Sequence, residues 1–229
     1  GVEMSSEKVP IVQKKIIKRA RYFGKPVVVA TQMLDSMINN PSPTRAEASD
    51  VANAIYEGTD AVMLSGESAI GKYPLKAIKV MSDIIETVES DKDNFDLHNL
   101  DNEFKRKADN TDAITSAAYL IANNANAKAI ITFSVSGKTT MRMAKERAPV
   151  QIVGLSPNLY TARKLQLLWG VNSCHGKDAK SASEMVDIAC KIIKEKDLVK
   201  KDENVIITAG VPFGSAGSTN LLRIAKIIE

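Results

Sequence analysis

Hydrophobic residues follow two kinds of spacing along the chain, one typical of helices and one typical of buried strands. Between Glu7 and Phe23 they recur every three or four positions, which predicts an amphipathic helix that Gly24 ends. Residues 26–30 then read Pro-Val-Val-Val-Ala. A continuous β-branched run of this kind predicts a strand that is covered on both faces, as in a parallel sheet.

The same order continues up to residue 90. Thr44 and Glu47 have the spacing of a capping box, which predicts the start of a helix that reaches Tyr56. Residues 60–64 predict a second buried strand, and residues 73–90 predict a long helix with one apolar face. This succession of helices and strands is a fragment of a repeating β/α array.

Residues 91–110 are rich in Asp, Asn, Lys and Glu, which indicates a linker between two domains, 1–90 and 111–229. A second β/α series follows the linker, with Asp112 and Ser181 as the expected caps of two helices. The pattern predicts a compact, mainly parallel α/β domain, with strands at 129–133, 150–155, 171–174 and 204–208, helices at 112–125, 139–147, 158–169 and 181–196, and a final segment at 220–228.

The composition is that of an ordinary globular chain, with 44% hydrophobic and 25% charged residues among 229. No apolar run of about 18 residues and no secretory signal is visible, so no membrane span and no export are expected. Cys174 and Cys190 form no metal-ligand motif, which favours free thiols in a reducing cytoplasm over a zinc site. The net charge is +4, and the basic cluster between Lys14 and Arg21 is interpreted as a solvated helix face rather than a nucleic-acid surface.

Residues 134–139, Ser-Val-Ser-Gly-Lys-Thr, lie where a strand passes into a helix. A nucleotide P-loop would need glycine in place of Thr132, so that pattern fails. Backbone N–H groups at a helix N-terminus, several hydroxyls and Lys138 could still hold a phosphate. The alternative is that Ser136 or Thr139 only caps the helix, and the motif alone leaves both interpretations open.

Residues 210–219 follow a different strand and contain Gly210, Gly214 and Gly217. The loops after neighbouring parallel strands gather at one edge of the sheet, which is where ligands bind. Because glycine allows the backbone to approach a ligand closely, this loop is a candidate second wall of the same site. Its alternative interpretation is a flexible turn.

Thr31 and Ser65 each follow a buried strand, the position from which parallel α/β proteins present side chains to small polar ligands. An isolated threonine or serine more often satisfies local backbone groups, so that alternative also stays open. Asp35 and Glu67 could act as acids or metal ligands, although surface carboxylates are too frequent for the pattern to decide.

The chain resembles the pyruvate kinases over essentially its whole length. The resemblance is most specific in Gly24-Lys25-Pro26, in Ala30-Thr31-Gln32-Met33-Leu34, in residues 41–47 and 49–54, and in Met63-Leu64-Ser65-Gly66-Glu67. It implies that residues 1–90 form the last strands and helices of a (β/α)8 barrel and that residues 111–229 form the C-terminal regulatory α/β domain.

The family transfers phosphate from phosphoenolpyruvate to ADP in glycolysis, giving pyruvate and ATP, with Mg²⁺ (or Mn²⁺) and K⁺. By resemblance, its metal ligands and catalytic lysine lie upstream of the segment that matches Gly1-Val2-Glu3. The chain is therefore expected to be a truncated, carboxy-terminal portion without metal ligands that is inactive alone. The resemblance leaves two catalytic residues, Thr31 near the substrate methylene and Ser65 on the same path of proton delivery to the enolate.

The resemblance also implies a regulatory site, in which the loop at 134–139 binds an effector phosphate and the loop at 210–219 closes over it. The effector is expected to be a sugar phosphate or a nucleotide, and Lys138 stands where an arginine is common. The implied binding residues are Ser134, Ser136, Gly137, Lys138, Thr139, Gly214, Gly217 and Thr219.

The sequence is compatible with three functions. The chain could be a portion of a pyruvate kinase, a stand-alone module that binds phosphorylated metabolites, or a structural oligomerisation fragment. For the intact enzyme the resemblance implies a cytoplasmic homotetramer with neither a nucleic-acid nor a membrane partner. Sequence upstream of Gly1 separates these functions, because a Gly-Asp-Leu preceded by barrel strands would indicate the enzyme.

Overall fold

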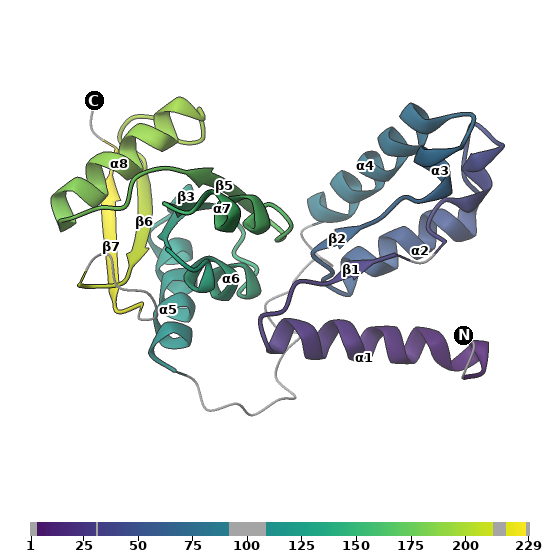
Figure 1. Ribbon diagram of the computed structural model, residues 1–229, viewed down its shortest axis with the longest axis horizontal. Helices are drawn as coiled ribbons and strands as arrows, with labels where there is room; N and C mark the ends of the chain where they lie inside the picture. Colours follow the sequence, from purple (N-terminus) through teal and green to yellow (C-terminus); the bar gives the residue numbers. More distant parts are fainter. Residues whose placement is uncertain (1–3, 31, 92–108, 213–218, 228–229) are drawn as a thin grey trace. The chain divides into compact units, whose positions relative to one another are not determined.

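Two units of the chain, Gly1–Phe104 and Lys105–Glu229, each build a hydrophobic core of their own. The computed structural model describes residues 4–30, 32–91, 109–212 and 219–227 (Figure 1). The predicted linker at 91–110 therefore lies almost entirely outside the described residues.

The first unit packs helices against a short parallel pair of strands. Its elements are η1 (Ser6–Lys8), α1 (Val9–Tyr22), β1 (Val28–Val29), η2 (Asp35–Ile38), α2 (Arg45–Tyr56), β2 (Ala61–Val62), α3 (Gly66–Ala69) and α4 (Pro74–Ser90). The two strands pair in register Val28↔Ala61 and Val29↔Val62. Both are shorter than predicted, because within the described residues each has one hydrogen-bonding neighbour and no second strand extends the ladder.

Helix α2 begins as its sequence predicts. The Thr44 hydroxyl accepts a hydrogen bond from the Glu47 backbone N–H, and the Glu47 carboxylate accepts one from the Thr44 N–H, which is a complete capping box. The helix buries Val51 and Ala54 in the core of the first unit, together with Met37 of η2 and Met81 of α4. Local sequence and packing thus agree on where α2 starts and which face it buries.

The second unit is a five-stranded sheet with helices on both faces (Figure 1). Its strand order is β5-β4-β3-β6-β7, with β7 antiparallel to β6 and the other neighbours parallel. Its elements are α5 (Asn110–Asn124), β3 (Ala129–Phe133), α6 (Lys138–Lys145), β4 (Gln151–Ser156), α7 (Leu159–Leu165), β5 (Val171–His175), α8 (Ala182–Glu195), β6 (Asn204–Ala209) and β7 (Leu221–Lys226).

Two helix boundaries in this unit differ from the prediction. The cap of α5 is Asp109 rather than Asp112, because Asp109 accepts from the Asp112 N–H and Asp112 completes the capping box in return. Helix α7 ends at Leu165 and not near Trp169, since the chain must turn back through Gly170, at a φ of +67°, to enter β5. The predicted cap Ser181 is confirmed, with its hydroxyl accepting from the Glu184 N–H.

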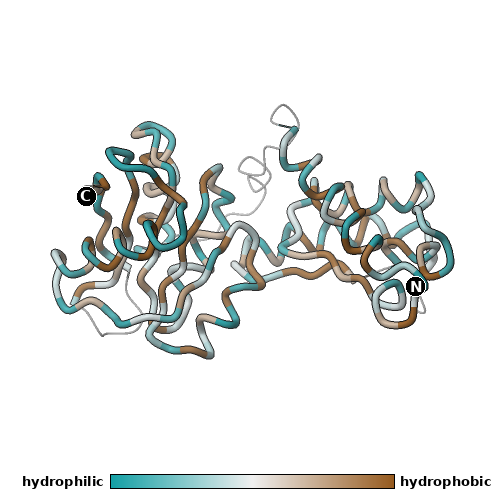
Figure 2. Tube along the Cα trace, turned by 90° about the horizontal axis from the view of Figure 1, so that it is seen from above, coloured by the Kyte–Doolittle hydropathy of each residue, from teal (hydrophilic) through white to brown (hydrophobic). Residues whose placement is uncertain are grey.

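Alternate residues of each strand enter the cores on the two faces of the sheet. One face packs against α8, whose Met185 and Ile193 are fully buried, and the other packs against α5, α6 and α7. With both faces covered, β3, β4 and β6 are apolar along most of their length, whereas the outer turns are hydrophilic (Figure 2).

The strand order creates a switch point beside β3. The chain moves from β3 to β4 and β5 on one side, and then crosses to place β6 on the other side. In open α/β sheets the loops that leave two such strands diverge to opposite faces, and a crevice opens at their carboxyl ends. The loops after β3 and β6 therefore meet at the edge where a ligand is expected.

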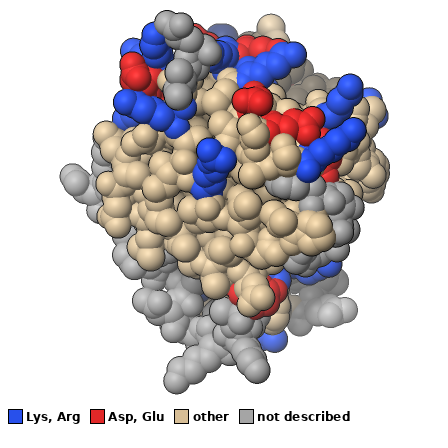
Figure 3. Space-filling model, turned by 90° about the vertical axis from the view of Figure 1, so that its left-hand side faces the viewer, with Lys and Arg blue, Asp and Glu red and all other residues tan. Residues whose placement is uncertain are grey.

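The surface of the second unit mixes both signs of charge. On the side next to β7 and α8, lysine and arginine side chains lie among aspartate and glutamate near one end, and the middle is largely uncharged (Figure 3). No helix in the described residues combines the length and the apolarity that a membrane crossing requires.

Candidate functional site

The loop after β3 turns into α6 at Gly137. This residue is the N-cap of the helix and has a φ of +81°, a region that favours glycine. A Cβ at this position would lie 3.0 Å from Thr161 Cγ2 and 3.2 Å from Leu165 Cδ2 of α7. The turn therefore requires glycine both for its backbone conformation and for its close packing.

The first N–H groups of α6 are arranged as an anion site would need them. Ser134 is buried, and its hydroxyl accepts a hydrogen bond of 3.3 Å from the Thr139 N–H. In the described part of the chain no acceptor faces the N–H groups of Ser136, Gly137 or Lys138. The Ser136 and Lys138 side chains are exposed beside these groups.

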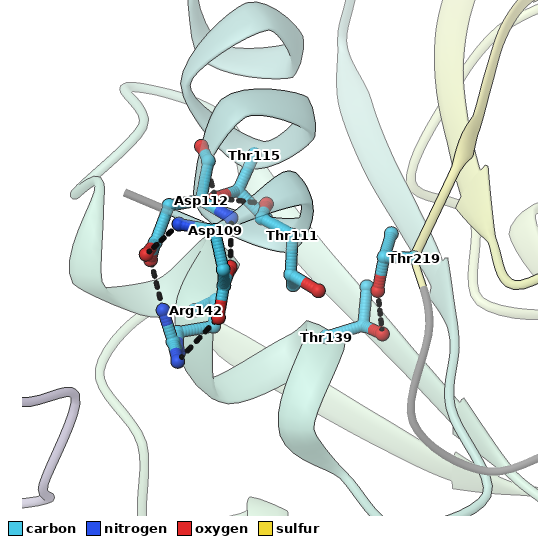
Figure 4. A network of polar contacts seen from close by, with 7 residues as sticks. All are labelled: Asp109, Thr111, Asp112, Thr115, Thr139, Arg142 and Thr219. Carbon is cyan, nitrogen blue, oxygen red and sulfur yellow. Dashed lines mark hydrogen bonds and ion pairs between the residues drawn. The ribbon is translucent and has the colours of Figure 1, made fainter. Parts of the chain in front are cut away.

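The alternative that Ser136 or Thr139 caps α6 is wrong. The N-cap is Gly137, which has no side chain, and the hydroxyl that accepts from the first turn of α6 belongs to Ser134. Instead, the buried Thr139 hydroxyl lies 2.6 Å from the hydroxyl of Thr219, at the end of the second loop (Figure 4). This contact joins residues 80 positions apart in sequence and brings the two predicted loops together.

Asn220 closes the base of the second loop, and its role was not predicted. Its side-chain amide accepts from the Val211 N–H and donates to the Val211 carbonyl, both at 2.7 Å. The pair imitates a rung of a β-ladder, so the loop starts and ends at a fixed width. Gly214 and Gly217, which were predicted to bind the effector phosphate, lie outside the described residues.

Helix α6 is also held from its side by an ion-pair network (Figure 4). Arg142 donates to Asp112 and, at 3.2 Å, to Asp109, the two residues of the α5 capping box. Partial burial alone would lower the pKa of Arg142, but the hydrogen bonds and charges of Asp112 and Asp109 raise it. The helix that presents Lys138 and Thr139 is thereby fastened to the N-terminus of α5.

A pocket of about 990 Å³ lies at the same edge of the sheet. It is formed by the segments that follow β4, β5 and β6, and its lining includes Pro157, His175, Lys177, Lys180, Val211 and Pro212. The volume is at the upper end of what small-molecule sites offer. Two lysines, two carboxylates (Asp178 and Glu184) and the first residues of the loop that Asn220 closes thus border a space large enough for a metabolite.

In the first unit, the two predicted catalytic positions differ in what the structure shows. Thr31 lies outside the described residues. Ser65 follows β2, is exposed, and is the N-cap of α3 without a side-chain capping hydrogen bond. Ser65 therefore occupies the cap position of α3, but its hydroxyl makes no capping hydrogen bond and has no hydrogen-bond partner among the described residues.

Glu67 is buried, with 3% of its surface exposed, although the sequence suggested a surface carboxylate. Its Oε1 accepts from the Leu34 N–H at 3.0 Å, and its Oε2 accepts from the Ser65 N–H at 2.8 Å. One carboxylate thus joins the loop after β1 to the loop after β2.

A second carboxylate, Glu47, holds the same loop further along. It accepts from the Ser36 N–H at 2.7 Å and from the Ser36 hydroxyl at 2.6 Å, besides its bonds to Thr44. Partial burial would raise the pKa of Glu47, but the hydrogen bonds from Ser36 and Thr44 outweigh it and lower the pKa to about 2.

The described residues do not fit a metal site. No three side chains of His, Cys, Asp or Glu are grouped there as ligands, and both Glu67 oxygens already accept from backbone N–H groups. Asp35 is exposed at the start of η2. Neither Asp35 nor Glu67 belongs to a group of ligands such as Mg²⁺ requires.

Each of the two units matches a known protein family. A family model described as the pyruvate kinase barrel domain matches residues 1–78, and one described as the pyruvate kinase alpha/beta domain matches residues 112–225. The pyruvate kinase of Geobacillus stearothermophilus is 46% identical over 230 residues, covering 100% of this chain and 39% of the relative. That of Methylorubrum extorquens is 46% identical over 227 residues, covering 99% and 47%.

A crystal structure of a pyruvate kinase from Cryptosporidium parvum matches with a TM-score of 0.90 and 34% identity, over 100% of this chain and 45% of that one. The fold is thus that of an α/β enzyme, with the end of a catalytic barrel followed by a mainly parallel C-terminal domain. The chain belongs to the pyruvate kinase family. It spans less than half the length of these relatives.

The lowered pKa of Glu47 predicts how the stability of the fold depends on pH. Because the folded-state pKa of about 2 is below the ordinary value of 4.5, its ionised form stabilises the fold above pH 4.5, and this contribution is lost as the pH falls from 4.5 towards 2. Glu47→Gln should lower the melting temperature at pH 7, and the difference from wild type should shrink below pH 4.5.

Thermal unfolding followed by circular dichroism between pH 7 and pH 3 measures this difference. Asp83→Asn is the matched control, because Asp83 lies on the exposed face of α4 and pairs with Lys79. A difference between wild type and Glu47→Gln that stays constant with pH would contradict the proposed role of the ionised carboxylate.

Proposed function

We propose that this chain is the carboxy-terminal portion of a cytoplasmic pyruvate kinase that transfers phosphate from phosphoenolpyruvate to ADP, giving pyruvate and ATP in glycolysis. The observation that carries the proposal is the match of two consecutive pyruvate kinase domains to residues 1–78 and 112–225. A shared fold alone would not support it, because one fold serves many reactions. Here the segments around Thr31 and Ser65, at the strand ends, also resemble those of the family.

The proposed part of this chain in the reaction is the delivery of a proton. After phosphoryl transfer, the enolate of pyruvate takes a proton at C3, a C–H bond forms, and the C2–O bond becomes a carbonyl. Thr31 and Ser65 would stand on the path of that proton, which solvent then replaces. The exposed Ser65 hydroxyl at the end of β2 supports this role, since no side-chain capping bond occupies it.

The intact enzyme would use Mg²⁺ (or Mn²⁺) and K⁺, which stabilise the charge of the transferring phosphoryl group. The described residues contain no group of ligands for a divalent ion. The ligands are therefore proposed to lie elsewhere in the enzyme, as in the resemblance.

The second unit is proposed to bind an allosteric effector, either a sugar phosphate or a nucleotide. Its phosphate would lie on the N–H groups of Ser136, Gly137 and Lys138, with the charge of Lys138 and the dipole of α6 favouring an anion. The remainder of the effector would occupy the pocket of about 990 Å³ beside Val211. Gly214, Gly217 and Thr219 belong to the loop that would close over it.

Two further proposals concern assembly and an alternative function. The intact enzyme would be a homotetramer, and the edge strand β7, whose outer side has no hydrogen-bonded strand among the described residues, offers one surface for subunit contact. The alternative function is a stand-alone module that binds a phosphorylated metabolite without catalysis. It is supported by the second unit, whose sheet is covered on both faces by its own helices.

Activity of the chain alone is the first test. The 229-residue chain should form no pyruvate from phosphoenolpyruvate and ADP, whereas the full-length polypeptide should do so in the presence of Mg²⁺ and K⁺. A spectrophotometric assay of pyruvate measures both. Robust turnover by the chain alone would contradict the proposed location of the metal ligands, and an inactive full-length protein would favour the stand-alone module.

Substitution of the two strand-end hydroxyls tests the proton path. In the full-length enzyme, Ser65→Ala and Thr31→Val should lower kcat more than they change KM for phosphoenolpyruvate, because the proton is transferred in or near the transition state. Acid–base groups contribute about 10²–10⁴-fold, and one member of a path contributes less. Normal turnover in both variants, measured by steady-state kinetics, would leave these hydroxyls without a catalytic role.

Removal of the Lys138 charge tests the effector site. Lys138→Ala loses one charge-assisted hydrogen bond, about 1.5–3 kcal/mol, which corresponds to about one to two orders of magnitude in effector affinity. Calorimetric titration with sugar phosphates and nucleoside monophosphates measures it. Lys145→Ala, at the other end of α6, is the matched control. Equal affinities for wild type and Lys138→Ala, or no binding by wild type, would contradict the regulatory site.

A further inference from the structure

Glu67 joins the two catalytic strand ends in a way that neither its sequence context nor the proposed reaction assigns. Its two carboxylate oxygens accept from the Leu34 and Ser65 N–H groups, which lie 33 and 2 residues away in sequence. Leu34 is fully buried and comes three residues after Thr31. The carboxylate therefore joins the backbone at Leu34 to the backbone at Ser65.

The surroundings of Glu67 make this bridge rigid. A Cβ added to Gly66 would meet Ile38 Cδ1 at 2.8 Å, and the Lys72 N–H donates to the Ile38 carbonyl at 2.8 Å. Helix α3 is thus packed directly against η2, and the Glu67 side chain is enclosed between them. A buried carboxylate that accepts two backbone hydrogen bonds holds both segments, because loss of either bond leaves a buried polar group without a partner.

We propose that Glu67 is a positioning residue for the proton transfer, which it serves by holding Leu34, three residues after Thr31, and Ser65 at one separation. It does not touch the substrate in this account. The proposal rests on the proposed pyruvate kinase activity and adds to it the group that sets the geometry of the proton path. Displacements of about 1 Å from a productive geometry can cost about 10²-fold in rate.

Asp60 provides a matched control at the opposite end of the same two strands. Its Oδ2 accepts from the Val27 N–H at 2.9 Å, also across 33 residues. Asp60 precedes β2 and Val27 precedes β1, whereas Ser65 and Leu34 follow these strands. Asp60→Asn and Glu67→Gln each remove the charge of a carboxylate that bridges the same strands. Asn can still accept the single bond from Val27, whereas Gln offers one acceptor for the two N–H groups of Leu34 and Ser65, beside the proposed proton path.

The test uses the full-length enzyme and two readouts. The first is steady-state turnover, and the second is the exchange of the pyruvate methyl protons with D₂O, followed by ¹H NMR, which reports proton transfer at C3 without phosphoryl transfer. Glu67→Gln should lower both kcat and the exchange rate about 10- to 100-fold, with little change in KM. Asp60→Asn should leave both near the wild-type values.

Equal losses in the two variants, in proportion to their losses of thermal stability, would overturn the proposal, and so would normal exchange in Glu67→Gln. If Glu67→Gln does not fold, Glu67→Asp replaces it. That variant keeps the charge and both acceptor oxygens but withdraws them by one methylene, and the same selective loss of exchange is expected. A wild-type enzyme without turnover and without exchange would overturn the proposed function itself.

Discussion

The hydrogen-bonded ladder of β3 with both β4 and β6 is the constraint on which the second unit depends. It pairs Thr132 with Gly154 on one side and with Thr208 on the other, so the carboxyl ends of the three strands lie at one edge. This register therefore determines where the loops after β3, β4 and β6 begin. Gly137, Thr139 and Thr219 meet there because the sheet brings them together, and not because they are close in sequence.

In the first unit, the loops that follow the strands are held in place by side chains and not by a long ladder. Its strands β1 and β2 share two residue pairs, which is too little to align the loops that follow. Two carboxylates bridge the strands, Asp60 before them and Glu67 after them. Glu47 then holds the next turn of the loop at Ser36. The carboxylates thereby satisfy the buried N–H group of Leu34 and the partly buried ones of Val27 and Ser36.

Much of the fold follows from local sequence. The β-branched runs, the Thr44 capping box and the period of the helices predicted the order of elements correctly, because each of these signals acts within a few residues. The exact starts and ends did not follow. Asp112 was predicted to cap α5, but Asp109 is the N-cap and Asp112 is its capping-box partner at N3, and Arg142 bonds to both.

The residues of the candidate sites could be proposed from the sequence, but the contacts that hold them could not. The Ser-Gly-Lys-Thr segment left an anion site and a helix cap both open, and among the described residues the N–H groups of Ser136, Gly137 and Lys138 make no hydrogen bond, which favours the proposal of an anion site. The burial of Glu67 and the closure of the second loop by Asn220 had no signal in the sequence, since both depend on a partner more than eight residues away. Such contacts exist only after the sheet has formed.

The central claim is that the edge beyond β3 and β6 binds a phosphorylated metabolite. A crystal structure of the chain with a bound sugar phosphate or nucleoside monophosphate tests it most directly. The account predicts a phosphate within hydrogen-bond distance, about 3.2 Å, of the N–H groups of Ser136, Gly137 and Lys138. A ligand phosphate bound elsewhere, with these N–H groups facing only water, would contradict it.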